Sequence, residues 1–597
     1  MSLSEGFFAI LAASKGVHAE RQDAKAERED LKADTITSRR PSNVPAPISC
    51  LPVEILSTIF SYVQEYEKPE IRDISKCFPP QVYIDGPEET TLGWMAITHV
   101  CSHWRRVAIQ TPALWSYVSL MWNSDRMSAI LKRAQSTPLC ITYSWDDDLN
   151  PEDQQDLTPD ALDIVNGHIT HTQCLHISTS AQSLEQLLSK LIRPAPVLNA
   201  VTFVAYDAQE SPIVSRIPPE LFDGDAPNIK TLTLVNCVVP WNSLKFHSLV
   251  QNLVSLDIYF PRSSELLAVD RSAGVTIPRS ELFPSLAQLR TLLRLATRLE
   301  RLLLRSILPE CAHFDFRQEE AIYLPNLKSY NLDGNVYDCA VVARHIFPSP
   351  NSRLELHCFF EDDEGTEAEY SAIVAVLEHH ISFWNQSSTS TSSSEITLDL
   401  YSDCVRIVCD AYQIVVHSEW DALRDDLTRK CLGLLPSPAP TKLLFNHKWT
   451  DATDLDLILV LGTKTLHTIT EVVAIMLTNM LAFQKLCDAL CERSGPNATI
   501  PPERVYQHGA FLLFPQLRVL SMKWLSLQDF GQGCLHSLRR AIALRREYGN
   551  PIERLELRSC RDVGGHWLEE LRSIPGLQIL YDDVGAVIGS EWIIQEW

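Results

Sequence analysis

Seven segments of the chain share one spacing of apolar residues, in which a second apolar residue follows three positions after the first and a third follows two positions later. The segments begin at Leu198, Ile229, Leu253, Leu299, Leu327, Leu517 and Ile552. The last two apolar residues of each segment alternate with polar ones, as in a short strand that buries one face. The first apolar residue lies in the preceding turn. The pattern therefore predicts a series of short strands that all bury the same face.

The intervals between these segments indicate a repeat. The starts at 229, 253, 299 and 327 are separated by 24, 46 and 28 residues, and we interpret the interval of 46 as two units, one of them degenerate. This is the spacing of leucine-rich repeats, whose stacked copies share one continuous core. In Pro227-Asn-Ile229 and Pro325-Asn-Leu327 the proline ends the preceding helix.

Stretches between the strands have helical apolar spacing, as in Leu286 to Ala296 and Leu535 to Arg546, and these helices would form the outer layer. The predicted fold class is α/β, with a short N-terminal all-α module followed by an irregular leucine-rich-repeat solenoid over residues 121–597. A two-layer α/β domain with ordinary leucine-rich strands is the alternative, because repeats from about 340 to 510 are hard to register.

Residues 48–120 form the first predicted folded unit. A helix opens at Leu51 with a proline in its first turn. Apolar residues then follow at helical spacing, at Leu56, Ile59, Phe60 and Val63. A second helix, from about 92 to 109, places Ile97, Val100, Trp104, Val107 and Ala108 on one stripe. Helices of this size leave apolar surface that needs a partner.

At these residues the chain resembles the F-box family, in the form common in large fungal sets. The resemblance rests on three ordered blocks, which are Leu51 to Phe60, Val100 to Ala108, and Thr111 to Trp115. It departs from compact F-boxes in a longer insertion at about 64–91. The resemblance implies that the segment docks onto the Skp-type adaptor of a cullin-RING ubiquitin ligase, while another part of the chain binds the substrate. By analogy, the adaptor-binding residues are Leu51, Pro52, Ile55, Leu56, Ile59, Val100, Cys101 and Trp104. The alternative is a helical cap on the first repeat.

The strand pattern also predicts a target-binding face. Residues that alternate with the buried positions point away from the core. The candidate substrate-binding residues are Thr231, Asp257, Tyr259, Arg301, Arg305, Asn331, Arg554 and Arg558.

Two further regions are predicted to lie outside the packed core. Residues 1–47 read as a charged helix followed by a proline-rich linker, and the acidic run 361–369 and the Ser/Thr-rich run 387–394 read as surface loops.

Charge, apolar run length and cysteine usage indicate which partners and which cellular compartment to expect. The formal net charge of −23 makes nucleic acid an unlikely main partner. The longest later apolar stretch, near 472–483, is too short to span a bilayer, so we expect no membrane segment. The 16 cysteines are scattered among hydrophobic residues, which favours reduced thiols and a cytoplasmic or nuclear location.

Motifs for chemistry are incomplete. The histidines and cysteine at His168, His171, Cys174 and His176 favour a surface pair over a metal site, and His99 and His103 lack a third ligand nearby. Around Lys464 the glycines of a phosphate-binding loop are missing. We therefore predict no metal, no cofactor and no catalytic activity. An enzyme hidden in 340–510 and a protein-binding scaffold with no ligase role remain the competing hypotheses.

Overall fold

The computed structural model describes the chain in segments, and the fold is taken from these alone. They are residues 51–66, 71–72, 89–90, 93–144, 157–206, 214–260, 279–309, 321–349, 352–359, 367–387, 395–400, 404–409, 412–417, 442–447, 469–475, 480–491, 514–523, 531–558, 560 and 565–581. The predicted charged helix and linker at 1–47 lie outside them, as do residues 361–366 and 388–394 of the two predicted loops. Helix α12 (Glu367–Ser387) begins inside the predicted acidic loop at 361–369. The last three residues of that run are therefore helical and do not form a loop.

The chain divides into two compact units. Unit 1 comprises residues 1–144 and 157–176, and unit 2 comprises residues 145–156 and 177–597. The predicted boundary after residue 120 therefore falls inside unit 1, which continues through a strand–helix–strand segment and a further helix. Strand β5 (Thr172–Ser180) spans the boundary between the units.

Unit 1 contains short helices followed by two parallel strands. Its elements are α2 (Val53–Tyr66), β1 (Ile71–Arg72), β2 (Glu89–Thr90), η4 (Gly93–His99), α3 (Ser102–Ile109), η5 (Pro112–Trp115), β3 (Tyr117–Ser119), α4 (Ser124–Ala134), β4 (Leu139–Ser144), α5 (Pro159–His168) and η7 (Ile169–His171). We predicted one helix over 92–109, but the structure has a 3-10 helix and an α-helix separated at Val100 and Cys101. Cys101 has extended backbone and its sulfur accepts a hydrogen bond from the Trp104 amide at 3.4 Å, so it starts a new helix.

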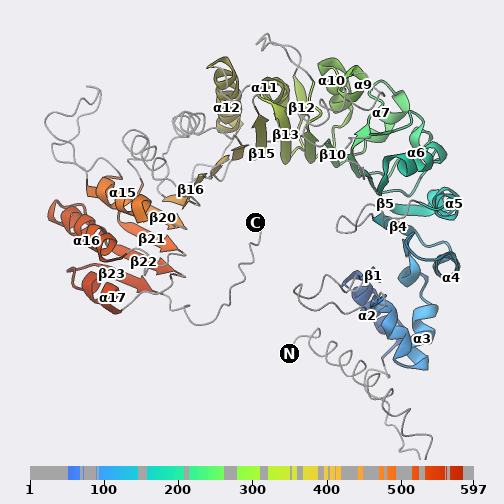
Figure 1. The fold of residues 1–597 in the computed structure, drawn as a ribbon, viewed down its shortest axis with the longest axis horizontal. Helices are drawn as coiled ribbons and strands as arrows, with labels where there is room; N and C mark the ends of the chain where they lie inside the picture. Colours follow the sequence, from blue (N-terminus) through green and yellow to red (C-terminus); the bar gives the residue numbers. More distant parts are fainter. Residues whose placement is uncertain are drawn as a thin grey trace, which may run out of the picture. The chain divides into compact units, whose positions relative to one another are not determined.

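Unit 2 is built on one mainly parallel sheet (Figure 1). Its main strands are β6 (Ala200–Tyr206), β8 (Thr231–Val235), β10 (Ser255–Tyr259), β11 (Arg301–Arg305), β13 (Ser329–Asn335), β15 (Arg353–Phe359), β16 (Glu395–Leu400), β17 (Cys404–Cys409), β18 (Tyr412–His417), β19 (Lys442–His447), β20 (Glu471–Ile475), β21 (Val519–Lys523), β22 (Arg554–Arg558) and β23 (Gln578–Tyr581). Short parallel pairs form from β7 (Ser215–Arg216) with β9 (Cys237–Val238) and from β12 (Ile322–Leu324) with β14 (Ile346–Pro348).

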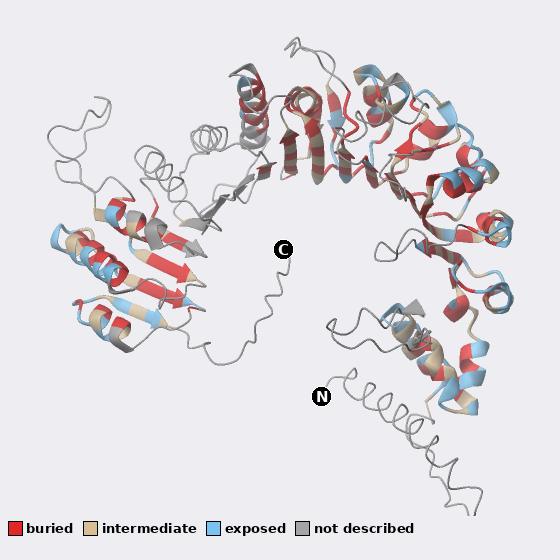
Figure 2. Cartoon of the chain, in the orientation of Figure 1, coloured by how far each residue is buried: buried red, intermediate tan, exposed pale blue. Residues whose placement is uncertain are grey.

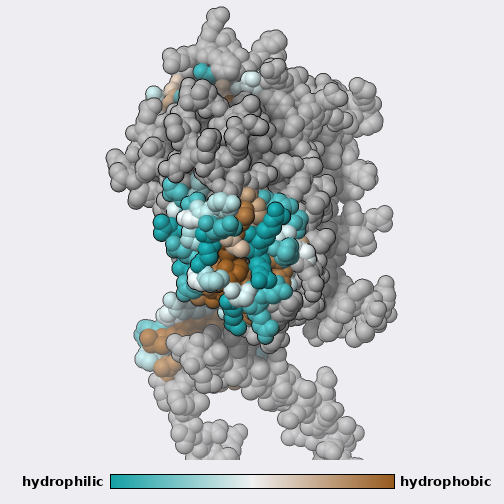
Figure 3. Space-filling model, turned by 90° about the vertical axis from the view of Figure 1, so that its left-hand side faces the viewer, coloured by the Kyte–Doolittle hydropathy of each residue, from teal (hydrophilic) through white to brown (hydrophobic). Residues whose placement is uncertain are grey.

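The helices of unit 2 lie between these strands in sequence. They are α6 (Ala181–Lys190), η8 (Leu221–Gly224), α7 (Leu244–Val250), α9 (Arg279–Leu282), α10 (Leu286–Leu295), α11 (Val336–His345), α12, α15 (Met480–Cys491), α16 (Gly531–Glu547) and α17 (Gly565–Arg572). Figure 1 shows α7, α10 and α11 on one side of the neighbouring strands. The predicted helices at 286–296 and 535–546 correspond to α10 and α16. Figure 3 shows a mainly hydrophilic surface on the C-terminal part of unit 2.

The strands that contain the apolar pattern are paired in register. Leu232, Leu256, Leu302, Tyr330 and Leu354 stand side by side on five neighbouring strands, and each is almost completely buried. Figure 2 shows that buried residues recur along these strands. The shared spacing therefore produces a continuous apolar layer beneath the helices.

Strand β10 pairs directly with β11, with Leu256 opposite Leu302. The 46-residue interval is therefore a single strand-to-strand step, and our interpretation of it as two units was wrong. Residues 261–278, which lie outside the described part, account for much of the extra length.

Between 395 and 417 the sheet departs from a regular succession of parallel strands. The order there is β15-β18-β17-β16-β19, in which β17 is antiparallel to both of its neighbours. This reversal explains why a parallel repeat was hard to register in the sequence from 340 to 510.

A buried histidine joins α12 to the layers beneath it. His380 Nε2 donates a hydrogen bond to the Ala343 carbonyl at 3.0 Å, and the Tyr330 hydroxyl lies 3.1 Å from Nε2 and 3.3 Å from Nδ1. Burial, and after it the charge of the neighbouring His379, lower the pKa of His380 to about 3, although the hydrogen bond to Ala343 opposes the shift. The imidazole is therefore neutral in the folded protein at neutral pH.

We expect this histidine to make unit 2 less stable as the pH falls. The unfolded chain takes up a proton near pH 6.5 while the folded chain does not, so the free energy of unfolding should fall below that pH by about 1.4 kcal/mol per pH unit from this group. Urea unfolding at pH 7.0 and 5.5 would measure the change, and His380→Gln should reduce the pH slope. Equal slopes for the two proteins would contradict the assignment.

Candidate functional site

The helices α2, η4, α3 and η5 form a small core of aromatic residues, which we call the helical module. Phe60 of α2 packs on Trp104 of α3 with ring centroids 5.2 Å apart, and Trp94 packs on Trp115 at 5.0 Å. The Trp115 indole donates a hydrogen bond to the Ala108 carbonyl at 2.9 Å. These contacts fix the faces of α2 and α3 that turn inward.

Helical periodicity separates the inward and outward residues of α2. Leu56 and Phe60 lie four positions apart and are both 0% exposed, whereas Ile55 and Val53 are each 48% exposed. Successive residues on a helix differ by about 100°, so the residue before a buried one can face solvent. Pro52 is also exposed, and Ile59 is partly exposed.

The structure divides the predicted adaptor-binding residues into three groups. Exposed residues are Pro52, Ile55 and Val100, and partly exposed residues are Leu51, Ile59 and Cys101. Leu56 and Trp104 are 0% and 2% exposed, so they pack in the interior of the module and support the surface from within. Val100 was predicted on the buried stripe, but the break before α3 turns it outward. Sequence reasoning missed Val53, since its burial could not be separated from that of its neighbours.

The predicted substrate-binding residues fall on one face of the sheet in unit 2, which we call the polar face. The register places Thr231, Ser255, Arg301, Ser329 and Arg353 in one row. A second row contains Thr233, Asp257, Leu303, Asn331 and Glu355, and a third contains Val235, Tyr259, Arg305, Asp333 and His357. Arg554 and Arg558 lie on the same sheet at β22, and the structure does not bring them next to these rows.

Polar side chains of neighbouring strands contact one another on this face. Arg301 Nη2 lies 2.8 Å from Asp257 Oδ2, and its Nε donates to the Ser255 hydroxyl at 2.8 Å. Burial raises the pKa of Asp257, although the charge of Arg301 opposes the rise. The face can therefore present fixed hydrogen-bonding groups to a protein target.

Strand β15 adds residues that sequence reasoning missed. Glu355 Oε2 lies 3.1 Å from Arg353 Nη2, and Oε1 lies 3.0 Å from His357 Nε2. His357 is also within 3.3 Å of the Asn331 amide. The alternation of Leu354, Leu356 and Cys358 was a signal that could have identified this strand.

The histidine cluster of unit 1 contains one close pair. His168 Nδ1 lies 3.1 Å from His171 Nε2, and burial, then the nearby His171, lowers the pKa of His168. Among the described residues, no group of three or more histidine, cysteine or acidic side chains is placed to hold a metal ion. The described helices likewise include none with the length and hydropathy of a membrane span.

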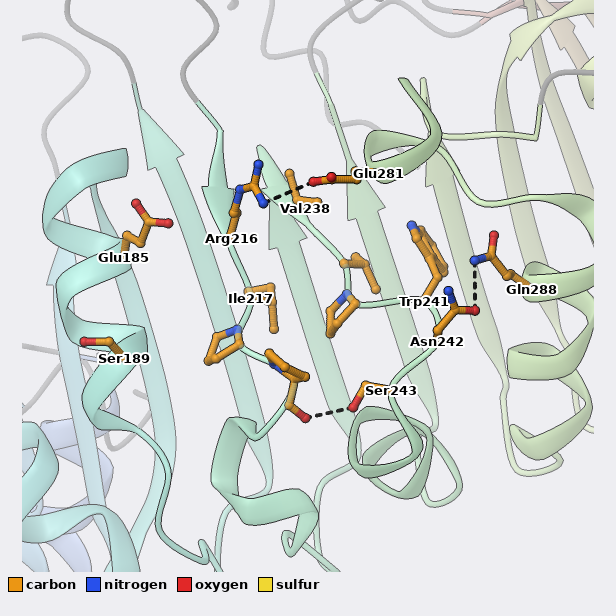
Figure 4. A pocket seen from close by; sticks show the side chains of 14 residues that line it. Glu185, Ser189, Arg216, Ile217, Val238, Trp241, Asn242, Ser243, Glu281 and Gln288 are labelled. Atoms are coloured by element: carbon orange, nitrogen blue, oxygen red, sulfur yellow. Dashed lines mark hydrogen bonds and ion pairs between the residues drawn. The ribbon is translucent and has the colours of Figure 1, made fainter. Parts of the chain in front are cut away.

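An open groove of about 680 Å³ lies between α6, the β7–β9 pair and α10 (Figure 4). Its floor is apolar, with Ile217, Val238 and Trp241 among the lining residues. Polar groups at its rim contact each other, since Arg216 lies 3.1 Å from Glu281 and the Gln288 amide donates to Asn242 at 2.9 Å. The groove lies outside residues 340–510, and we assign no catalytic role to it.

We expect adjacent residues of α2 to differ sharply in their effect on stability. Leu56→Ala removes a buried side chain and should cost about 2–5 kcal/mol, whereas Ile55→Ala should cost less than about 1 kcal/mol. Hydrogen exchange of the α2 and α3 amides in the full chain would report both changes. Similar protection losses in the two variants would contradict the observed faces.

Comparison with known proteins bears on the helical module. No curated protein matches the chain. A family model described as F-box-like matches residues 48–121, which agrees with the predicted unit at 48–120. The chain thus contains an F-box-like domain, whose core is Leu56, Phe60 and Trp104 and whose exposed apolar residues begin at the first turn of α2.

Proposed function

We propose that the chain is the substrate-recognition subunit of an SCF-type cullin-RING ubiquitin ligase. The observation that carries the proposal is the F-box-like match at 48–121 combined with exposed apolar residues on that domain. F-box domains typically bind Skp-type adaptors in cullin-RING ligases. In this role the chain contributes binding and no catalysis, since ubiquitin transfer belongs to the other subunits.

The adaptor contact requires apolar surface that is available before binding. The side chains of Val53, Ile55 and Val100 are 42% to 48% exposed. Pro52, which precedes Val53, is also exposed. Complete burial of a large aliphatic side chain contributes about 1.5–3 kcal/mol, so half-exposed residues gain roughly half of that each. Several such residues together can offset part of the entropy lost on association.

We propose further that unit 2 is an irregular leucine-rich-repeat domain that binds the target. In-phase parallel strands with a buried aliphatic layer and an opposite polar face support this assignment. The proposed target contacts are the eight candidate residues of the polar face, which are Thr231, Asp257, Tyr259, Arg301, Arg305, Asn331, Arg554 and Arg558. The scattered cysteines favour a reducing compartment, so we place the complex in the cytoplasm or the nucleus.

We expect Ile55→Asp combined with Val100→Asp to weaken adaptor binding at least tenfold without unfolding the domain. The two side chains are exposed, so a carboxylate is tolerated in the free protein but must lose water in the complex. Co-purification and calorimetry with a purified Skp-type adaptor would measure the loss.

A matched control for that experiment is Leu244→Asp, because Leu244 is 82% exposed and lies in unit 2. This variant should bind the adaptor like the unmodified chain. Adaptor binding that survives the double change in the F-box-like domain would remove the proposal. Failure of the unmodified chain to bind at high adaptor concentration would favour the alternative, a protein-binding scaffold with no ligase role.

A further inference from the structure

The two ends of the polar face carry different net charge. On strands β10 to β15 the cations and carboxylates are equal in number, with Arg301, Arg305 and Arg353 against Asp257, Asp333 and Glu355. On strands β19 to β22 four cations face two carboxylates, with Lys442, Lys523, Arg554 and Arg558 against Glu471 and Glu556. The second group, which we call the basic strip, has an excess of two positive charges in a chain whose formal net charge is −23.

Glu556 orders the two arginines of the strip. Its Oε1 lies 3.0 Å from Arg554 Nε and its Oε2 lies 2.8 Å from Arg558 Nη2. The Glu556 side chain is 6% exposed, whereas the arginine side chains are 39% and 53% exposed. One carboxylate therefore holds two guanidinium groups in place but neutralises only one of them, and both retain N–H groups that face solvent.

Strand β21 extends the strip sideways. Lys523 is the Cα partner of Arg558, and Ser521 is the partner of Glu556, so all four side chains share one face. Ser521 is 1% exposed and its hydroxyl has no hydrogen-bond partner. A water that bridges this hydroxyl to a bound carboxylate can satisfy it.

We propose that the basic strip binds an acidic segment, rich in Asp and Glu, of the target protein. The inference rests on the proposed target-binding role of unit 2 and names the chemistry of the target. Arg554 and Arg558 lie four residues apart on one strand, about 13 Å along it, which matches carboxylates spaced along an extended peptide. Each guanidinium can pair with one of them.

The same cations fit nucleic acid less well. Binding to nucleic acid gains affinity from many phosphate contacts, and the strip offers only a few cations. The net charge of −23 repels a long nucleic acid along the whole length that lies near the protein. A short acidic peptide is close only to the strip and meets less of this repulsion. An acidic peptide therefore satisfies the strip with the smaller electrostatic cost.

The test is fluorescence anisotropy of a labelled twelve-residue Asp/Glu-rich peptide with the full chain in complex with its adaptor. The peptide should bind, and its affinity should fall as salt is raised from 50 to 300 mM, because the contacts are charged. The same peptide with Gln and Asn in place of Glu and Asp should bind at least tenfold more weakly. Equal binding of the two peptides would overturn the proposal.

Removing the arginines alone would leave Glu556 buried without a partner and could unfold the strand. The informative variant is therefore Arg554→Gln with Glu556→Gln and Arg558→Gln, which removes the three charges together. This triple variant should bind the acidic peptide at least tenfold more weakly than the unmodified chain, and Lys523→Gln should bind it severalfold more weakly. Arg554→Lys with Arg558→Lys keeps the charge and should restore part of the affinity.

Arg216→Gln with Glu281→Gln serves as the matched control, because it removes an exposed ion pair of unit 2 that lies outside the main sheet. This variant should bind the peptide normally. Peptide binding that is unchanged in the triple variant, or single-stranded RNA that binds more tightly than the peptide at 150 mM salt, would overturn the inference. Adaptor binding, measured for every variant, separates this outcome from failure of the ligase role, which depends on the F-box-like domain.

Discussion

The fold of unit 2 depends on one packing interaction, the burial of aliphatic side chains that stand in register on neighbouring parallel strands. Leu232, Leu256 and Leu302 have the same position on their strands, and the helices cover them from one side. Because side chains alternate along a strand, a shift of one residue would place these leucines in water. The apolar layer thus fixes the register of every strand that contributes to it.

The same register determines the chemistry of the opposite face. Once the leucines are buried, the residues between them must align across strands, and this brings Arg301 beside Asp257 and Arg558 beside Lys523. No separate interaction is needed to assemble these groups. The polar face is therefore a direct consequence of the core, and its charge pattern can vary between strands at little cost to the fold.

The F-box-like domain solves a different problem, because it is too small to bury all of its apolar residues. Phe60 and Trp104 fill its interior, and Ile55 and Val53 remain half exposed on the helix that contributes Phe60. The free energy that a larger core would supply is limited by the number of residues. Apolar surface left over in this way is suited to a partner protein, which is the role that the F-box-like match suggests.

The sequence by itself determined the periodic features. The spacing of apolar residues located seven strands of the sheet, α10 and α16, and the motif blocks located the F-box-like domain, because these signals depend only on which residues alternate or recur. Only the tertiary structure decided which neighbours pair. It placed β10 next to β11 although their paired residues lie 46 positions apart, reversed the strand order near β17, and separated Leu56 from Ile55. Those outcomes depend on long-range contacts and on the rotation of one helix against another, which the identity of nearby residues does not specify.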